Sequence, residues 1–328
     1  MVTRRHFLSL ASLSLAPMVA GLPARAFAAD DVIRLMVGFQ AGGGLDLVAR
    51  ALSAQLNNGR LANSKSIVEN KPGAAGRLAA SLVAHGPKDG SQLLVTPSPV
   101  LTLFPHTIAS VPYDPLHDFA AVGSLAKFDY AFAVATDTHI TSLKQYIRQA
   151  KDNKKLQTFG SPGIGLTPDF VGMMLARANG FKLLHVGYKG TAPALQDLMG
   201  GQIAAVCATT PALATAQKTG RLRVLATTGA RRSPELPDVP TFQEEGIKDL
   251  VLEDWFGLFA RAGTPNDVIA SLNKAVQASL ADKKLQSQFK TQGFEVAGGT
   301  PEEAQSLLND DYEKWASIVK AVGYKATS

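Results

Sequence analysis

The sequence contains one cysteine in 328 residues, so an intramolecular disulfide is excluded. That residue, Cys207, stands in the apolar run 203–208, and a small buried hydrophobic side chain is its expected role. A nucleophilic thiol is the alternative. The lack of any C-x-x-C pair excludes the common thiol metal and redox motifs.

Catalytic and nucleotide-binding motifs are lacking as well. The sequence has no G-x-S-x-G, no H-E-x-x-H and no G-x-x-x-x-G-K-[ST]. The histidines stand apart from one another and from paired carboxylates, and each is expected at the surface or in a turn: His6, His85, His106, His117, His139 and His185. We therefore expect no catalytic residue, no metal and no cofactor. An exported α/β hydrolase or isomerase is the alternative, but the sequence offers it no nucleophile–base pair.

Clustered charge and long apolar runs are scarce. The 33 basic and 27 acidic residues give a formal charge of +6, and the basic residues are scattered without interleaved aromatic side chains. This pattern argues against a nucleic-acid surface. Beyond the N-terminal region, no run is long and apolar enough to span a bilayer.

Residues 1–29 have the pattern of a twin-arginine export signal. Arg4 and Arg5 precede a mildly apolar run over 8–22, and Ala26-Phe27-Ala28 is a small-x-small cleavage site. The apolar run is too short and too interrupted for a membrane anchor. We expect cleavage and export, most simply to a bacterial periplasm.

A strand–glycine–helix unit over 32–56 organises the rest of the chain. A buried strand over 32–37 leads into three successive glycines at 42–44, and an amphipathic helix is predicted from about Leu47. The glycines let backbone N–H groups approach a ligand, and the helix start offers unpaired N–H donors and the positive end of its dipole. The unit therefore fits a carboxylate or phosphate. A sharp turn without a ligand is the alternative, and a dinucleotide motif fails because Leu47 replaces its third glycine.

A second unit of the same kind follows more than a hundred residues later. A strand over 157–160 runs into the loop 161–166 and a helix over 167–179. The two loops are expected to face each other across a cleft and hold one small anion. Thr167 as N-cap would place Asp169 at the second helical position, where its carboxylate gains about 0.3–1 kcal/mol from the helix dipole. That charge would repel a second charge on the ligand, so the fixed carboxylate is expected mainly on the amides of 42–44 and on the loop 161–165.

Strand and helix patterns alternate along the chain, which predicts α/β layers with mostly parallel sheets. Four helices are expected to begin with threonine as N-cap and proline at the first helical position. These pairs are Thr167-Pro168, Thr210-Pro211, Thr264-Pro265 and Thr300-Pro301. No segment resembles a flexible linker, so two domains would have to be joined by strands that cross between them.

Several motifs occur in a fixed order along the chain. They are Gly42-Gly43-Gly44-Leu45-Asp46, Glu69-Asn70-Lys71-Pro72-Gly73-Ala74, Val111-Pro112-Tyr113-Asp114-Pro115, Tyr188-Lys189-Gly190-Thr191-Ala192-Pro193, Leu236-Pro237-Asp238-Val239-Pro240-Thr241 and Trp255-Phe256-Gly257-Leu258-Phe259. Together they resemble the Bug family, the periplasmic solute-binding receptors of tripartite tricarboxylate transporters. The resemblance covers essentially the whole chain after the export signal.

The resemblance implies a type II periplasmic binding protein, a Venus flytrap of two α/β domains joined by crossing hinge strands. The first domain would comprise 30–128 and 254–328, and the second 129–253, with the hinge near Phe128 and Glu253. Such a receptor binds a small organic carboxylate, performs no chemistry and delivers the ligand to the permease subunits in the membrane. We expect a monomer. A ligand-sensing receptor for a signalling partner shares the binding step and is a further alternative.

The candidate ligand-binding residues follow from the two loops and from the family pattern. They are Phe39, Gln40, Ala41, Gly42, Gly43, Gly44, Asp46, Ser98, Ser161, Gly163, Gly165, Thr167, Asp169, Tyr188 and Thr209. The chain departs from the family at several of these places. Gln40 and Ala41 replace prolines, Leu45 replaces threonine, Leu166 replaces serine, Asp169 replaces histidine, and Ala208-Thr209 replaces an Asp-Asn pair. The identity of the acid is therefore left open.

Overall fold

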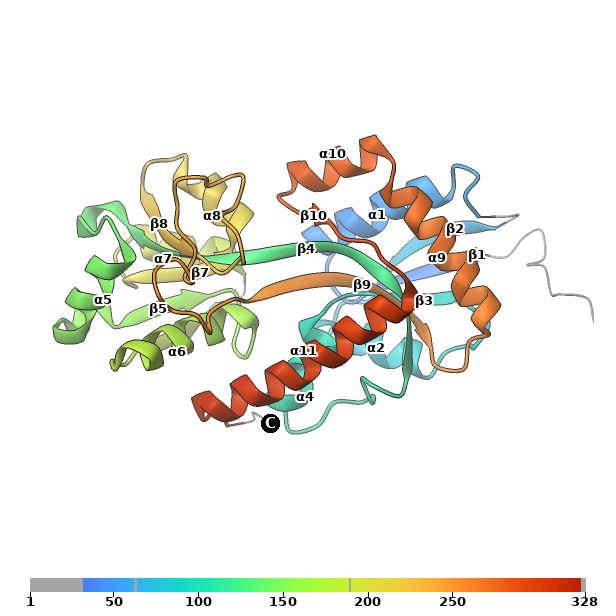
Figure 1. Cartoon of the computed structure of the whole chain (residues 1–328), viewed down its shortest axis with the longest axis horizontal. Helices are drawn as coiled ribbons and strands as arrows, with labels where there is room; N and C mark the ends of the chain where they lie inside the picture. The colour runs from blue at the N-terminus through green and yellow to red at the C-terminus, as the bar shows by residue number, and fades with distance from the viewer. Residues whose placement is uncertain (1–31, 62–63, 189, 326–328) are drawn as a thin grey trace, which may run out of the picture.

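The computed structural model describes residues 32–61, 64–188 and 190–325, and the predicted export signal lies outside these ranges. The described chain forms two α/β lobes joined by two long strands, β4 (Phe119–Ala135) and β9 (Glu253–Arg261), as Figure 1 shows. None of the helices in these ranges is long and apolar enough to cross a membrane.

The first lobe is built from both ends of the described chain. Its early elements are β1 (Val32–Val37), α1 (Gly44–Leu56), β2 (Lys65–Asn70), the 3-10 turn η1 (Ala74–Gly76), α2 (Arg77–Ala84), β3 (Gln92–Pro97), α3 (Pro99–Thr102) and α4 (Phe104–Thr107). Its late elements are α9 (Asn266–Leu280), α10 (Lys283–Thr291), β10 (Glu295–Val296) and α11 (Pro301–Val322).

The second lobe is the middle of the chain. Its elements are η2 (Thr136–Thr138), α5 (Leu143–Asp152), η3 (Lys154–Leu156), β5 (Thr158–Ser161), α6 (Thr167–Asn179), β6 (Leu184–Gly187), α7 (Thr191–Met199), β7 (Ala205–Thr209), α8 (Thr210–Gln217) and β8 (Leu222–Thr227).

Parallel and antiparallel pairings are divided between the lobes and the crossing strands. β1 pairs in parallel with β2 and β3, and β5 pairs in parallel with β6 and β7. Every antiparallel pairing in the described chain involves β4 or β9. The α/β class is confirmed, but the prediction of mostly parallel sheets is wrong, because the crossing strands add antiparallel ladders to each parallel unit.

β4 changes partners along its length. Residues 119–129 pair with β9, and residues 130–135 pair with β7 and β8. The strand-like runs 120–125 and 130–135 of the sequence predict two separate strands here, whereas the structure has one strand of 17 residues. The exchange of partners falls between Asp129 and Tyr130, one residue after the boundary proposed from the sequence. The division into domains itself stays a prediction.

Helix α11 packs on both lobes. Its first half contributes Ala304 and Leu308 to a first-lobe cluster, whereas Trp315 and Val319 belong to the second-lobe core. The ring centroids of Trp315 and Phe170 of α6 lie 5.3 Å apart. Figure 1 shows this helix, in red, running from the first lobe along the crossing strands. A third element therefore connects the lobes.

The Thr-Pro pairs behave as predicted at one helix only. Thr300 caps α11 with its side chain, and Glu303 completes a capping box. α6 and α8 begin at the threonine itself, and α9 begins after Pro265, so these three predicted caps are wrong. At α6 the threonine hydroxyl bonds elsewhere, since Thr167 Oγ1 donates to Asp254 Oδ2 at 2.8 Å.

Candidate ligand site

The two glycine loops lie at strand ends that point toward the opposite lobe. β3 runs antiparallel to β9 and ends with Pro97 opposite Phe256, near the end of β9 that leaves the second lobe. β1 is parallel to β3, so its following loop lies at the same edge. β7 ends at Thr209 opposite Tyr130, and β5 runs parallel to it. The topology therefore places both loops between the lobes, the usual position of ligands in open α/β sheets.

The first loop presents backbone to solvent. Residues 40–43 are exposed, and Gly42 has φ +85°, a conformation that favours glycine. Gly43 is the N-cap with extended backbone, and α1 begins at Gly44, three residues before the predicted start. The first-turn N–H groups have no acceptor within the helix, so they remain available to an anion.

Asp46 fixes the shape of this loop. Its Oδ2 accepts the Gly42 N–H and the Arg50 Nε–H, both at 2.8 Å, and its Oδ1 accepts the Asn70 amide at 2.8 Å. Burial opposes ionisation of the carboxyl, but the bonds from Arg50, Gly42 and Asn70 outweigh it, so the pKa of Asp46 lies below its usual value. These bonds show that Asp46 supports the loop. Direct contact between Asp46 and a ligand stays a prediction. Phe39, next to the loop, is half-buried and packs against a first-lobe cluster.

The second loop repeats the same backbone arrangement but is less exposed: Ser161 and Gly165 are buried, whereas Ile164 is exposed. Gly165 has φ +71°, and its N–H donates to Asp169 Oδ2 at 3.1 Å. Asp169 is the third residue of α6, one position later than predicted, and only 3% exposed. A Cβ on Gly165 would lie 3.1 Å from the Tyr324 hydroxyl, so the loop touches the segment that follows α11. Gly163 is half-buried within this loop.

His185 joins Asp169 to Ser161, which corrects the prediction that every histidine lies at the surface or in a turn. His185 Nδ1 lies 3.2 Å from Asp169 Oδ1, and its Nε2 lies 2.7 Å from Ser161 Oγ. The His185 side chain is 14% exposed. Burial raises the pKa of Asp169, with His185 acting in the opposite direction, and burial lowers the pKa of His185.

The order of these three side chains is that of a nucleophile, a base and an orienting carboxylate. The expectation that the chain offers no nucleophile–base pair is therefore wrong as regards geometry, because Ser161 and His185 lie within hydrogen-bond distance. The hydroxyl is unsuited to attack, however, because Ser161 is fully buried and its Oγ also lies 2.7 Å from the Gly163 carbonyl oxygen. The arrangement shapes a loop and leaves no room for a substrate at Oγ.

The remaining predicted residues serve the crossing strands or the second lobe. Ser98, at the end of β3, accepts the Trp255 N–H through its Oγ at 3.2 Å. Tyr188 is half-buried and donates to Asp197 of α7 at 2.7 Å. Thr209 ends β7 opposite Tyr130 and precedes α8 without a side-chain cap. The structure thus gathers Ser98 and Thr167 around the crossing strands, while the Tyr188 hydroxyl is bonded within its own lobe.

Two carboxyl groups in the crossing strands, buried Asp254 and half-buried Asp129, escaped the sequence reasoning. Asp254 Oδ2 accepts hydrogen bonds from Tyr130 and Thr167, and burial raises the pKa of Asp254 to about 7. Burial likewise raises the pKa of Asp129 to about 6, although this carboxyl accepts the Gly229 N–H at 3.1 Å. The sequence signal that could have revealed these two carboxyl groups is an acidic residue inside an otherwise apolar strand.

A pocket of about 690 Å³ lies between the lobes beside β4 and β9. Its charged lining is balanced, with four basic and four acidic side chains: Lys127, Arg231, Arg232, Lys290, Asp129, Glu235, Glu253 and Glu295. Phe294 connects the pocket to the first loop, because a Cβ on Gly44 would lie 2.7 Å from its ring. The first loop does not line this pocket but lies next to it through Phe294. With the charged lining balanced, the main-chain amides of that loop are the neighbouring groups best suited to an anion.

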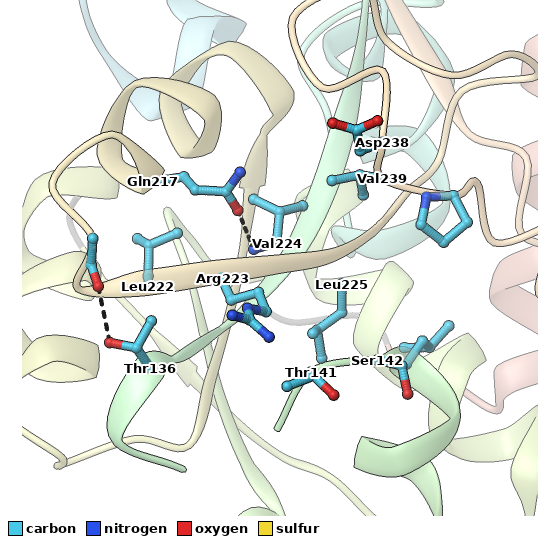
Figure 2. A pocket seen from close by; sticks show the side chains of 13 residues that line it. Thr136, Thr141, Ser142, Gln217, Leu222, Arg223, Val224, Leu225, Asp238 and Val239 are labelled. Atoms are coloured by element: carbon cyan, nitrogen blue, oxygen red, sulfur yellow. Dashed lines mark hydrogen bonds between the residues drawn. The ribbon is translucent and has the colours of Figure 1, made fainter. Parts of the chain in front are cut away.

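Another pocket, of about 480 Å³, is lined by residues of α5, α8 and β8 in the second lobe. Figure 2 shows its lining side chains. Thr136 donates to the Gly220 carbonyl at 3.0 Å, and Gln217 accepts the Val224 N–H at 2.7 Å. None of the predicted site residues lines this pocket or the one beside β4 and β9. The polar lining here also includes Arg223 and Asp238. In the ranges that the structure covers, no group of three His, Cys, Asp or Glu residues is placed to hold a metal.

Comparison with known proteins gives consistent matches. Residues 48–324 match the model of the tripartite tricarboxylate transporter family receptor. The structure of the periplasmic binding protein BugD is 32% identical and superposes with a TM-score of 0.77, covering 90% of this chain and 99% of BugD. R. palustris Rpa4515 with adipate is 27% identical, with a TM-score of 0.81 over 92% of this chain and all of the other. MatC from Rhodopseudomonas palustris with bound malate is 27% identical and superposes with a TM-score of 0.77, covering 89% of this chain and 100% of MatC.

Proposed function

The chain belongs to the tripartite tricarboxylate transporter family of receptors, and on that premise we propose that it captures a small organic carboxylate between its two lobes. The family consists of solute-binding receptors rather than enzymes. Two relatives of the same fold hold adipate and malate, which supports a carboxylate as the ligand class.

The observation that carries the proposal is the exposed amide group of the first loop. Gly43 and Gly44 place main-chain donors at the positive end of α1, at the edge of the sheet that points toward the second lobe. Neither residue has a Cβ to keep a ligand away. Asp46 is already neutralised by Arg50 and by amide donors, so its charge does not compete with the bound anion.

We further propose the division into two domains at 128/129 and 253/254, with closure by a hinge in β4 and β9. The exchange of partners along β4 supports the first boundary. Because α11 packs on α6 through Trp315, closure has to carry the end of this helix with the second domain or slide it across α6.

Export and delivery complete the proposal. The twin-arginine pattern of residues 1–29 and the periplasmic BugD relative support a periplasmic location. The receptor would act as a monomer and pass its ligand to the permease subunits of a tripartite tricarboxylate-type transporter, the partner that the family description implies.

A ligand screen tests the proposal. The purified mature protein is scanned by thermal shift against acetate, malate, succinate and adipate, and hits are titrated calorimetrically. At 100 times Kd a ligand stabilises the fold by about 2.7 kcal/mol, which gives a clear shift. Proton NMR of the ligand after overnight incubation should show it unchanged. No shift with any carboxylate, or consumption of a bound one, would contradict the receptor function.

A further inference from the structure

The hydroxyl of Ser161 has one hydrogen and lies between a carbonyl oxygen and an imidazole nitrogen. Its Oγ lies 2.7 Å from the Gly163 carbonyl oxygen and 2.7 Å from His185 Nε2. The Gly163 N–H points back at the same Oγ from 3.4 Å. A serine hydroxyl has one hydrogen and can accept two. The carbonyl can only accept, so the protonation of His185 decides whether both short contacts are hydrogen bonds.

Two cases follow for the imidazole. If Nε2 has no hydrogen, Nε2 and the carbonyl oxygen compete for one hydroxyl hydrogen, and one of these two acceptors is left without this donor. If Nε2 carries a hydrogen, it donates to Oγ, and Oγ donates to Gly163. Only the second case satisfies both contacts of Ser161. An acceptor without a donor in this half-buried turn is unfavourable, so the geometry favours the second protonation state.

The same count of donors and acceptors applies to Nδ1, on the other side of the imidazole ring. Nδ1 faces Asp169 Oδ1 at 3.2 Å, while Oδ2 of Asp169 accepts the Gly165 N–H. With Nε2 protonated, one further proton is needed between Nδ1 and Oδ1, because otherwise two lone pairs oppose each other. It resides either on the imidazole, giving an ion pair, or on the carboxyl. Both forms leave the pair with no net charge.

We propose that Asp169 and His185 retain this proton in the folded receptor, and that His185 is thereby a positioning residue for carboxylate binding. The proton keeps the turn 161–163 closed by hydrogen bonds and cancels the negative charge at the start of α6. Its loss opens the turn and places an uncompensated carboxylate beside the interlobe cleft. The positioning role depends on the proposed function; the retention of the proton does not.

The surroundings offer no other group that neutralises Asp169. In the part of the chain that the structure describes, no lysine or arginine forms an ion pair with this carboxylate, and His185 is its partner. On β7, Cys207 faces Asp169 and is buried, and burial raises the pKa of its thiol, so it stays neutral. On β5 the Phe159 ring covers the imidazole, with centroids 4.9 Å apart.

Other titratable groups approach from the crossing strands and from the C-terminal segment. Asp254 of β9 contacts the start of α6 through Thr167 and is hydrogen-bonded to Tyr130 of β4. Tyr324 lies over Gly165. Because burial raises the pKa of Asp254 to about 7, pH dependence of binding in the wild type alone would not identify the titrating group. The test therefore relies on variants and on direct observation of the ring.

The first experiment observes the imidazole without any ligand. Protein labelled with ¹⁵N-histidine is studied by long-range ¹H–¹⁵N correlation from pH 6 to 9, and His185→Gln identifies the signal. Nε2 is expected to be protonated at pH 6. A ring with hydrogen on Nδ1 only across the whole range would overturn the inference. This result is independent of the receptor function.

The second experiment measures calorimetric affinity for malate and adipate over the same pH range. Asp169→Asn can donate its amide to Nδ1 and keep hydrogen on Nε2 without a titrating proton. Its affinity should lose the part of the pH dependence that comes from the Asp169–His185 pair, and at pH 9 exceed that of the wild type by roughly tenfold, or about 1.4 kcal/mol. His185→Gln leaves the carboxylate unpaired and should bind weakly at every pH.

His117→Gln is the matched control, because His117 also contacts an aspartate, Asp114, at 2.9 Å, but is 80% exposed. It should bind like the wild type. Identical pH profiles for Asp169→Asn and the wild type would overturn the positioning role. Should His185→Gln fail to fold, the Asp169→Asn profile decides alone. If no carboxylate binds at any pH, the proposed function and the positioning role both fail, while the NMR result still decides the proton.

Discussion

The two glycine loops share one backbone device and differ in what surrounds it. In each, a glycine with positive φ donates its N–H to an aspartate four residues later, which is the third residue of the following helix. Gly42 and Asp46 form the device in the first lobe, and Gly165 and Asp169 form it in the second. The recurrence indicates that the aspartate holds the glycine turn at the helix start, whatever else the loop does.

The differences lie in the counter-ion and in the free amides. Arg50 neutralises Asp46 and is always charged, whereas His185 pairs with Asp169 and can lose its proton. The start of α1 has glycines at the N-cap and the first position, whereas α6 has Leu166 and Thr167 there, followed by Pro168, which lacks an N–H. The first loop is therefore suited to bind an anion through its amides. The second loop is suited to alter the cleft around the bound anion.

The largest expected effect comes from filling the first loop. Gly43 has φ −77°, and its nearest neighbour to a new Cβ is the Gln40 carbonyl oxygen at 3.6 Å, so Gly43→Val fits the backbone. The side chain would block the amides. Two lost hydrogen bonds to a charged ligand weaken binding by about 100-fold or more. Isothermal titration with adipate or malate measures the loss, and thermal unfolding should show at most about 1 kcal/mol of destabilisation from the poorer cap.

The control for this prediction is Leu166→Val. It alters the corresponding N-cap of α6, where a side chain already stands, so affinity should change by less than about threefold. Gly44→Val is unsuitable, because its Cβ would lie 2.7 Å from the Phe294 ring and disturb the hinge-side packing. Wild-type affinity in Gly43→Val would place the carboxylate away from the first loop.

The two aspartates should respond to amide substitution with opposite dependence on pH. The pKa of Asp46 is lowered, so its stabilising effect is present above the unfolded value of 3.8 and is lost as pH falls through the folded pKa. Asp46→Asn should therefore cost about 1–3 kcal/mol at pH 7 and progressively less below pH 4.

For Asp169 the sign reverses. Burial raises its pKa, so its contribution is fully present below 3.8 and is lost as pH rises through the folded pKa. Asp169→Asn, which is neutral throughout, should therefore gain stability relative to the wild type as pH rises from 4 to 8. Urea unfolding of both variants at several pH values measures the two trends. Parallel trends would show that the loops are electrostatically alike.

The contrast between the loops also separates what the sequence could predict from what it could not. Both strand–glycine–helix units are local, and their glycines and apolar periodicity were sufficient to place them. His185 is different. It lies 24 residues after Ser161, and the parallel register of β5 and β6, with Phe159 opposite His185, brings it to the same face as Ser161. Strand register depends on tertiary packing, so the histidine looked isolated in the sequence.

Helix starts were missed for a related reason. Thr167 has the residue type of an N-cap, but its hydroxyl serves Asp254 of a distant strand, and the helix begins one residue earlier than expected. Likewise β4 was divided in the sequence, because residues 126–129 interrupt its apolar pattern where it passes between the lobes. Local sequence propensity therefore predicts secondary structure best inside each lobe and least well where the lobes meet.

The smallest expected effect tests the shared device itself. Alanine at a positive φ costs about 1 kcal/mol, because its Cβ approaches the following carbonyl oxygen. Gly42→Ala has no atom within 4 Å of the new Cβ and should lose only that amount. Gly59→Ala is the matched control, since Gly59 also has positive φ and open space but belongs to neither loop.

Gly165→Ala should cost more, about 2 kcal/mol, because its Cβ would lie 3.1 Å from the Tyr324 hydroxyl and 3.8 Å from Thr107 Oγ1. Urea unfolding of the three variants measures the series. The excess at Gly165 reports how tightly the second loop is packed against the first lobe and the C-terminal segment. Equal losses at Gly42 and Gly165 would mean that the surroundings of the buried glycine yield as easily as those of the exposed one. The second loop would then be free to move during closure, and tight packing would not distinguish it from the first loop.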